Sequence, residues 1–285
     1  MRHAPELPWP SSGPSFDTTK TALCVLETRE NIAASRVIFY DESLRELGDL
    51  RLPYAGLGQY AQLPVIHEGA LFVIPGGYEG KRNERKVLEI DLSTLNVKAH
   101  TIDRVGMYGV AADDDYVYAC SNLNGYSYID RCTRSDGEVI EAKEEGLYVM
   151  SIILCEDRLC AFAEDILKSK PWLLVYDLNL ASVSRVDLSP CGRDQCRPLS
   201  WEGKVYFPSE LGTKGDNDNS EMLGVYDVGT GTLEAIPLGM AIQEVIPWGG
   251  HLAAFFGDMH DSANGKTTPV VLCDPSDGWS RGDAA

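Results

Sequence analysis

Residues 223–238 read LGVYDVGTGTLEAIPL, and this stretch decides the fold. A short apolar run ends in Tyr226-Asp227, a Gly-Thr-Gly turn follows, and a second alternating run begins. β-Branched and aromatic residues at a period of two, interrupted by residues that accept tight-turn angles, predict a β-hairpin.

The opening strand of this hairpin, an apolar segment that ends in aspartate, recurs along the chain. Its six aspartates are Asp41, Asp91, Asp130, Asp177, Asp227 and Asp274. They are 50, 39, 47, 50 and 47 residues apart. A period of this size built from short strands is typical of a β-propeller with one four-stranded blade per repeat. Each carboxylate is expected to accept backbone N–H groups from the turn that follows its strand.

We therefore predict an all-β chain that forms one domain over residues 1–285, a six-bladed β-propeller of four-stranded antiparallel blades. The irregular, proline-rich segment 1–18 is expected to help close the last blade, because little sequence remains after its third strand. The predicted strands of the first two blades are 21–27, 36–40, 47–52, 63–67, 70–75, 86–90 and 97–102. The other blades are expected over 107–143, 148–188, 197–238 and from 242 onward.

Charge and hydropathy exclude several classes of partner. The formal net charge is −18, which argues against nucleic acid or an anionic membrane as partner. No apolar run approaches the ~18 residues that a membrane-spanning helix needs. No signal peptide is visible, and a secreted form whose leader has been removed is left open. The expectation is a cytoplasmic monomer.

Eight cysteines are few for a disulfide scaffold. Cys24, Cys120 and Cys273 lie in apolar strand patterns and are interpreted as buried free thiols in a reducing compartment. Two further pairs, Cys155/Cys160 and Cys191/Cys196, leave disulfide formation open. Neither spacing is typical of a zinc site.

One repeat carries a recognisable motif. Leu71–Gly77 reads LFVIPGG, and after a variable loop Val87–Asp91 reads VLEID. The double glycine followed by a third strand that ends in aspartate resembles a kelch repeat. The glycine pair is clear in this repeat alone, and the expected tryptophan of the fourth strand is missing apart from Trp279. The resemblance implies a kelch-like propeller, a superfamily that contains both interaction scaffolds and sugar-handling enzymes.

Loop lengths indicate one binding face. The connections between second and third strands are long, at 76–85, 164–171, 209–221 and 257–268, whereas the first-to-second turns are tight. Insertions confined to one face of a propeller are typical of a recognition surface. We predict a scaffold that binds a protein or a small polar ligand there, with Arg82 and Arg85 in a cationic rim. A solvated basic loop is the alternative interpretation of these charges.

The beginnings of the first strands form the mouth of the central channel on the same face. Aligned by their tight turns, these strands place Gln62, Tyr108, Met150, Cys196 and Gln243 at one level. Adjacent positions add Tyr60, Tyr148, Arg197 and Glu244. The alternative function is therefore an enzyme for a carbohydrate or small polar acid. In it Arg197 would bind a carboxylate, with Glu244 or Tyr108 as acid/base. An ordinary wet channel with an Arg197–Glu244 ion pair is the other interpretation.

No cofactor and no metal is expected. Asn264–Thr267 looks like the end of a phosphate-binding loop, but the first glycine and the following helix are absent. Asp216–Glu221 and the group Asp258, His260 and Asp261 carry metal-capable oxygens and are interpreted as solvated surface loops. No catalytic residue is predicted beyond the alternative enzyme.

Overall fold

The computed structural model describes 23–27, 35–41, 43, 45–52, 65–74, 85–94, 96–191, 198–208, 222–237, 242–248, 251–256 and 270–273. These residues form antiparallel β-sheets and one short 3₁₀ turn, Ser189–Cys191. Within them, no helix has the length and apolarity that crossing a bilayer requires. The all-β prediction is confirmed.

The strands form six sheets in chain order, four of them four-stranded and two with three described strands. The first three sheets are β1 (Leu23–Glu27), β2 (Ser35–Tyr40), β3 (Glu46–Leu52); β4 (Val65–His67), β5 (Ala70–Val73), β6 (Lys86–Asp91), β7 (Val97–Thr101); and β8 (Met107–Ala112), β9 (Tyr116–Leu123), β10 (Tyr126–Thr133), β11 (Val139–Glu145). The last three are β12 (Leu147–Cys155), β13 (Arg158–Asp165), β14 (Lys170–Asp177), β15 (Ser182–Asp187); β16 (Leu199–Trp201), β17 (Lys204–Pro208), β18 (Met222–Asp227), β19 (Thr232–Pro237); and β20 (Ile242–Trp248), β21 (His251–Phe256), β22 (Val270–Cys273).

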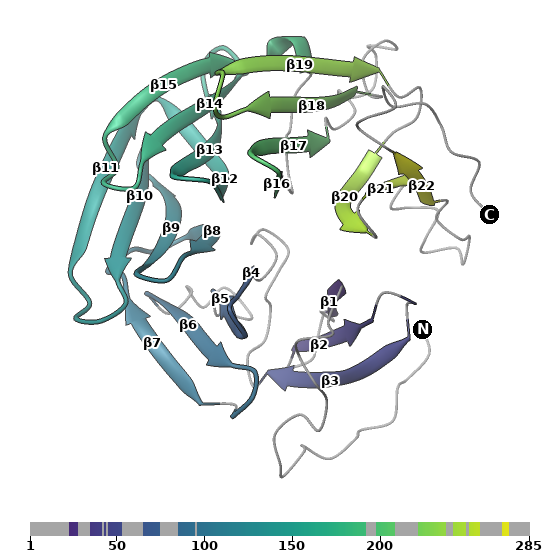
Figure 1. The fold of residues 1–285 in the computed structure, drawn as a ribbon. Helices are drawn as coiled ribbons and strands as arrows, with labels where there is room; N and C mark the ends of the chain where they lie inside the picture. The colour runs from purple at the N-terminus through teal and green to yellow at the C-terminus, as the bar shows by residue number, and fades with distance from the viewer. Residues whose placement is uncertain are drawn as a thin grey trace.

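Figure 1 shows these sheets following one another around a common centre. The first strand of each full sheet (β4, β8, β12 and β16) lies nearest the centre, and the fourth (β7, β11, β15 and β19) lies outermost. This arrangement is that of a β-propeller. The hairpin predicted over residues 223–238 is β18 paired with β19, in the register Asp227↔Thr232.

Hydrophobic cores lie between neighbouring sheets, not inside one of them. Phe72 of the second sheet packs toward Val110 of the third, and Phe162 of the fourth packs toward Phe207 of the fifth, with ring centroids 5.0 Å apart. Strand β5 is buried at all four positions because it contributes to cores on both of its faces. This explains why the middle strands read as continuous apolar runs rather than as alternating ones.

Four of the repeating aspartates have the predicted role. Asp41, Asp91, Asp177 and Asp227 each accept backbone N–H groups of the turn that follows, with distances between 2.8 and 3.0 Å. Asp274 lies outside the described residues.

For Asp130 the predicted turn role is wrong. This residue is buried within β10, which continues to Thr133, and its carboxylate pairs with Arg104 at 3.2 Å. The third strand of this repeat therefore ends three residues later than its aspartate suggested. Burial raises the pKa of Asp130, and the Arg104 guanidinium opposes that effect.

The structure shows which of the described cysteines are free thiols and whether Cys155 and Cys160 form a disulfide. Cys120 is buried and free, as predicted, and Cys132, Cys155, Cys160 and Cys191 are also buried free thiols. Cys155 and Cys160 thus do not bridge, although the sequence left that open. The side chains of Cys24 and Cys273, and all of Cys196, lie outside the description.

We expect these five thiols to be unreactive in the folded protein. Burial raises the pKa of Cys120 and Cys160 to about 12 and that of Cys191 to about 11, so thiolate is scarce at neutral pH. Labelling with a chromogenic disulfide reagent should leave them intact until denaturant is added, and then modify at least five thiols without reductant. Fewer than five would contradict the assignment of free thiols.

Candidate functional site

A central cavity of about 650 Å³ lies at one end of the inner strands. Most of its wall is formed by inner-strand residues that lie within four positions of the tight turns, and by residues of those turns. The lining residues are Val65, His67, Val110, Ala111, Ala112, Asp113, Asp114, Asp115, Tyr116, Ile152, Ile153, Leu154, Glu156, Leu178, Pro198, Leu199, Val245 and Ile246. We call this end of the channel the short-turn end, because the tight turns 68–69, 113–115, 156–157 and 202–203 surround it.

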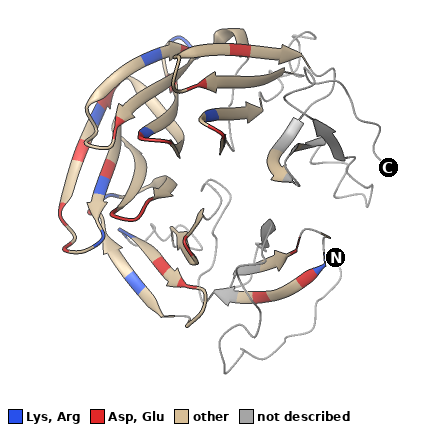
Figure 2. Cartoon of the chain, in the orientation of Figure 1, with Lys and Arg blue, Asp and Glu red and all other residues tan. Residues whose placement is uncertain are grey.

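The cavity has apolar walls and an acidic mouth. Valine, isoleucine and leucine side chains of five sheets line its depth, as in Val65, Ile152 and Val245. The tight turns carry exposed carboxylates, which we call the acidic rim: Glu68, Asp114, Asp115, Glu156 and Glu202. Figure 2 shows acidic residues at each of these turns.

Backbone geometry places three rim glutamates at equivalent points. Glu68, Glu156 and Glu202 each adopt a positive φ, of 44°, 52° and 49°. Each follows the last residue of an inner strand that pairs with the strand beyond. Two-residue turns with positive φ match the twist of the flanking strands. Because the same turn follows three of the inner strands, a glutamate occupies the equivalent position in each of these sheets.

The turn after β8 is held by its own aspartate. The Asp113 carboxylate accepts hydrogen bonds from the backbone N–H groups of Asp115 and Tyr116, at 2.9 and 2.7 Å, and from the Tyr118 hydroxyl at 3.1 Å. Burial raises the pKa of Tyr118, and the Asp113 charge adds to that effect. The Asp113 carboxylate is thus hydrogen-bonded within its own turn, whereas Asp114 is exposed at the cavity mouth.

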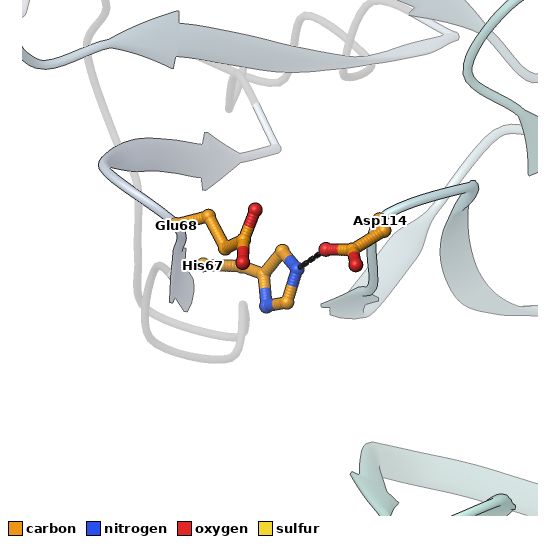
Figure 3. Close-up of side chains that lie close together, drawn as sticks. All are labelled: His67, Glu68 and Asp114. Atoms are coloured by element: carbon orange, nitrogen blue, oxygen red, sulfur yellow. Dashed lines mark hydrogen bonds and ion pairs between the residues drawn. The ribbon is translucent and has the colours of Figure 1, made fainter.

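Asp114 joins a cluster with two residues of the neighbouring sheet (Figure 3). His67, at the end of β4, places Nε2 2.7 Å from Asp114 Oδ1. Glu68, the next residue, completes the group, and one ligand-type atom from each residue lies within 4.8 Å of the other two. The His67 side chain is 29% exposed and that of Asp114 is 69% exposed, so the cluster is open to solvent.

A half-buried ionic network contacts the turn that carries Asp114. Arg134 donates to the backbone carbonyls of Asp113 and Asp114, at 2.8 and 2.9 Å, and to Glu89 Oε1 of the neighbouring sheet at 2.6 Å. The buried His100 lies 2.6 Å from the other Glu89 oxygen. Arg134 therefore couples β6 to the turn that carries Asp114.

Two pKa values in this network are shifted. Burial acts to raise the pKa of Glu89, but hydrogen bonds from Arg134 and His100 outweigh it and lower that pKa below its usual value. Burial lowers the pKa of His100, against the opposing influence of Glu89. At neutral pH the network therefore contains a charged Glu89 and a neutral His100.

Among the residues predicted from the sequence, Tyr108 and Tyr148 lie near the beginnings of β8 and β12, at the other end of the inner strands. Tyr108 and Tyr148 do meet, with ring centroids 5.6 Å apart. Burial raises the pKa of Tyr148, and its hydrogen bond with Tyr108 adds to the effect. Arg85 is exposed and forms an ion pair with Asp103.

The other predicted site residues are not placed by the structure. Gln243 and Glu244 lie in β20, with their side chains outside the description. Entirely outside it are Tyr60, Gln62, Arg82, Arg197, the acidic loop 216–221 and the segment 258–267 that held the other weighed motifs.

The predicted alignment of the inner strands has a structural counterpart. β-Bulges occur at Tyr108 in β8, at Met150 in β12 and at Gln243 in β20, where pairing skips one residue. These are three of the five positions that the tight turns aligned. Bulges redirect side chains and are frequent beside binding sites.

The cluster at the cavity mouth was not predicted from the sequence. His67 and Asp114 are 47 residues apart, which is the length of one repeat. A scan for acidic or histidine residues at equivalent tight turns of successive repeats would have found them, because such turns converge at one end of a propeller.

The fold has counterparts among solved structures. No protein-family model matches the chain, and no curated protein matches it. The chain is similar to a functionally unknown protein from Desulfotomaculum acetoxidans, with 10% identity over 91% of this chain and 78% of that one, at a TM-score of 0.57.

Two further solved structures are similar. The β-propeller domain of the Trilobed protease from Pyrococcus furiosus shares 11% identity over 88% of this chain and 78% of that one, at a TM-score of 0.52. A luciferin-regenerating enzyme shares 12% identity over 86% and 83%, at a TM-score of 0.51. Likeness at these identities shows the propeller fold alone.

Proposed function

We propose that this protein is a binding propeller that takes a small ligand with an apolar body and a positive charge into its central cavity. The observation that carries the proposal is an apolar cavity of about 650 Å³ beneath the acidic rim. Ligand sites are typically ~300–1,000 Å³, mostly apolar, with a few polar groups that fix orientation. The net charge of −18 would attract a cation toward this mouth.

The proposal is tested with three probes of one chain length: hexylamine, hexanol and hexanoate. We expect saturable binding by calorimetry in the order hexylamine, then hexanol, then hexanoate, because the rim attracts the ammonium and repels the carboxylate. Glu156→Gln should weaken hexylamine binding about two- to fivefold, since an exposed ion pair contributes ~0.5–1 kcal/mol. Binding of hexanol should be unchanged.

A matched control is Glu145→Gln, which removes the same charge from an exposed position on the outermost strand β11. It should leave the binding of all three probes as in the parent. If Glu145→Gln weakened hexylamine binding as much as Glu156→Gln, the effect would come from the net charge of the protein and not from the acidic rim. Equal affinity for hexylamine and hexanoate would contradict the proposed preference for a positively charged ligand.

A second candidate is the binding surface at the long-loop end, as expected from the sequence. The aligned bulges at Tyr108, Met150 and Gln243 and the Tyr108–Tyr148 pair favour it. Here the chain would act as a kelch-like scaffold for a protein or polar ligand, or as an enzyme that uses Arg197 and Glu244. Tyr108→Phe should weaken the binding of that protein or polar ligand at the long-loop end and leave the binding of hexylamine in the central cavity unchanged.

We also propose a blade count, a mode of ring closure, a compartment and an oligomeric state for this protein. We take the six sheets to be six blades of one domain, with the segment 1–18 closing the last of them. The five buried free thiols support a reducing, cytoplasmic setting, and a monomer is proposed.

A further inference from the structure

The strongest unassigned feature is the cluster of His67, Glu68 and Asp114 at the cavity mouth. One imidazole nitrogen and two carboxylate oxygens lie within 4.8 Å of one another. His67 ends β4, Glu68 follows it in the turn, and Asp114 comes from the turn after β8. Figure 3 shows the three side chains close together.

We propose that this cluster is a binding site for a divalent zinc ion. Zinc binds imidazole nitrogen at ~2.0–2.1 Å and carboxylate oxygen at ~2.0–2.2 Å, with tetrahedral geometry. Two ligand atoms of such a site are therefore about 3.4 Å apart. His67 Nε2 and Asp114 Oδ1, now 2.7 Å apart, would separate slightly to admit the ion. Glu68 would move in from within 4.8 Å.

The donor set favours zinc over the common hard cations. Calcium takes about six to eight oxygen ligands, and magnesium requires near-octahedral oxygen coordination. Imidazole as one of three ligands is typical of zinc and of neighbouring transition metals. Two carboxylates and a neutral imidazole also balance the charge of a divalent ion.

The backbone around the cluster is fixed before any ion binds. The turn at Glu68 is a two-residue hairpin with positive φ at both Glu68 and Gly69. The turn at Asp114 is held by the Asp113 carboxylate and by the Arg134 guanidinium. Binding therefore requires side-chain rotations alone, which limits the entropic cost of forming the site.

The position of the cluster would let a bound zinc ion contact a molecule in the cavity. His67 and Asp114 both line the cavity, and three protein ligands leave one tetrahedral position for water or for a donor atom of a bound molecule. The metal site stands independently of the proposed cavity ligand, because it is formed by the rim side chains alone.

The competing interpretation is an ordinary surface ion pair between His67 and Asp114. The experiment that separates the two is calorimetric titration of the full chain with zinc, calcium and magnesium in a non-coordinating buffer. We expect one zinc ion per chain, affinity for zinc at least tenfold above that for calcium, and a rise in Tm with zinc. His67→Gln and Asp114→Asn should each weaken zinc binding by at least tenfold.

Asp157→Asn is the matched control, because Asp157 is an exposed acid in the equivalent turn of the next sheet and pairs with Arg158 instead of a histidine. This variant should retain parental zinc affinity. Unfolding curves of all variants without metal establish that they fold. Zinc binding that survives both cluster variants, that falls equally in Asp157→Asn, or that is absent from the parent would overturn the proposal.

Discussion

Replacing Gly224 with alanine is expected to lower the free energy of unfolding by at least about 2 kcal/mol, because extra atoms in a packed core force strain on their neighbours. Gly224 lies in β18, in the stretch that decides the fold. A Cβ atom there would lie 2.0 Å from Cε2 of the Phe207 ring and 2.2 Å from Cζ. Phe207 is fully buried and packs against Phe162, so its ring has little freedom to move aside.

The matched control for this change is Gly229→Ala in the same hairpin. Gly229 is exposed, and a Cβ atom there would meet nothing nearer than Asp227 Oδ1 at 3.5 Å. Urea unfolding followed by tryptophan fluorescence should show a lower midpoint for Gly224→Ala and a nearly parental one for Gly229→Ala. Equal midpoints would mean that the Phe162–Phe207 contact tolerates the added methyl group.

Replacing Arg134 with methionine is expected to cost about 2–3 kcal/mol of stability at pH 7, because it breaks a half-buried ion pair and leaves three acceptors without the hydrogen bonds that Arg134 donates. The side chains of Arg134 and Glu89 are 21% and 16% exposed. The variant would leave Glu89 with His100 as its remaining described partner and the carbonyls of Asp113 and Asp114 without their donor. Chemical unfolding measures the loss.

The control for this second variant is Arg158→Met. Arg158 pairs with Asp157, whose side chain is 72% exposed, and such pairs contribute ~0–1 kcal/mol. Its loss should therefore be clearly smaller. A loss as small for Arg134→Met would show that the network between the second and third sheets adds nothing to stability.

The pH dependence gives the Arg134 prediction a second readout. The folded state lowers the pKa of both Glu89 and His100, so their stabilising contribution is present above the unfolded values of 4.5 and 6.5. It is lost as pH falls through the folded values. The difference between parent and Arg134→Met should accordingly begin to shrink as the pH falls below about 4.5, where Glu89 of the unfolded chain takes up a proton. It should shrink further until the pH passes the lower pKa that Glu89 has in the folded parent. A difference that stays constant down to pH 3 would contradict an ionic origin.

The sequence by itself determined the architecture, because short strands, tight turns and a repeated ending are local features. The apolar-Asp pattern located β2 of the first sheet and the third described strand of each other sheet within a few residues. The turn role of the aspartate was wrong at Asp130, and Asp274 lies outside the described residues. At Asp130, β10 continues past its aspartate, since burial beside Arg104 satisfies the carboxylate without a turn. The same local signals aligned the inner strands correctly at Tyr108, Met150 and Gln243, where the bulges occur.

Only the tertiary structure decided where chemically active side chains meet. The long loops predict a site at one end of the channel, whereas the cavity and the cluster of His67, Glu68 and Asp114 lie at the other. Long loops are tolerated because the entropic cost of closing a loop grows slowly with its length. The length of a loop therefore does not indicate where a cavity lies. Residues 47 positions apart come within 2.7 Å because successive sheets pack face to face, and that closeness depends on the packing of the sheets around their common centre.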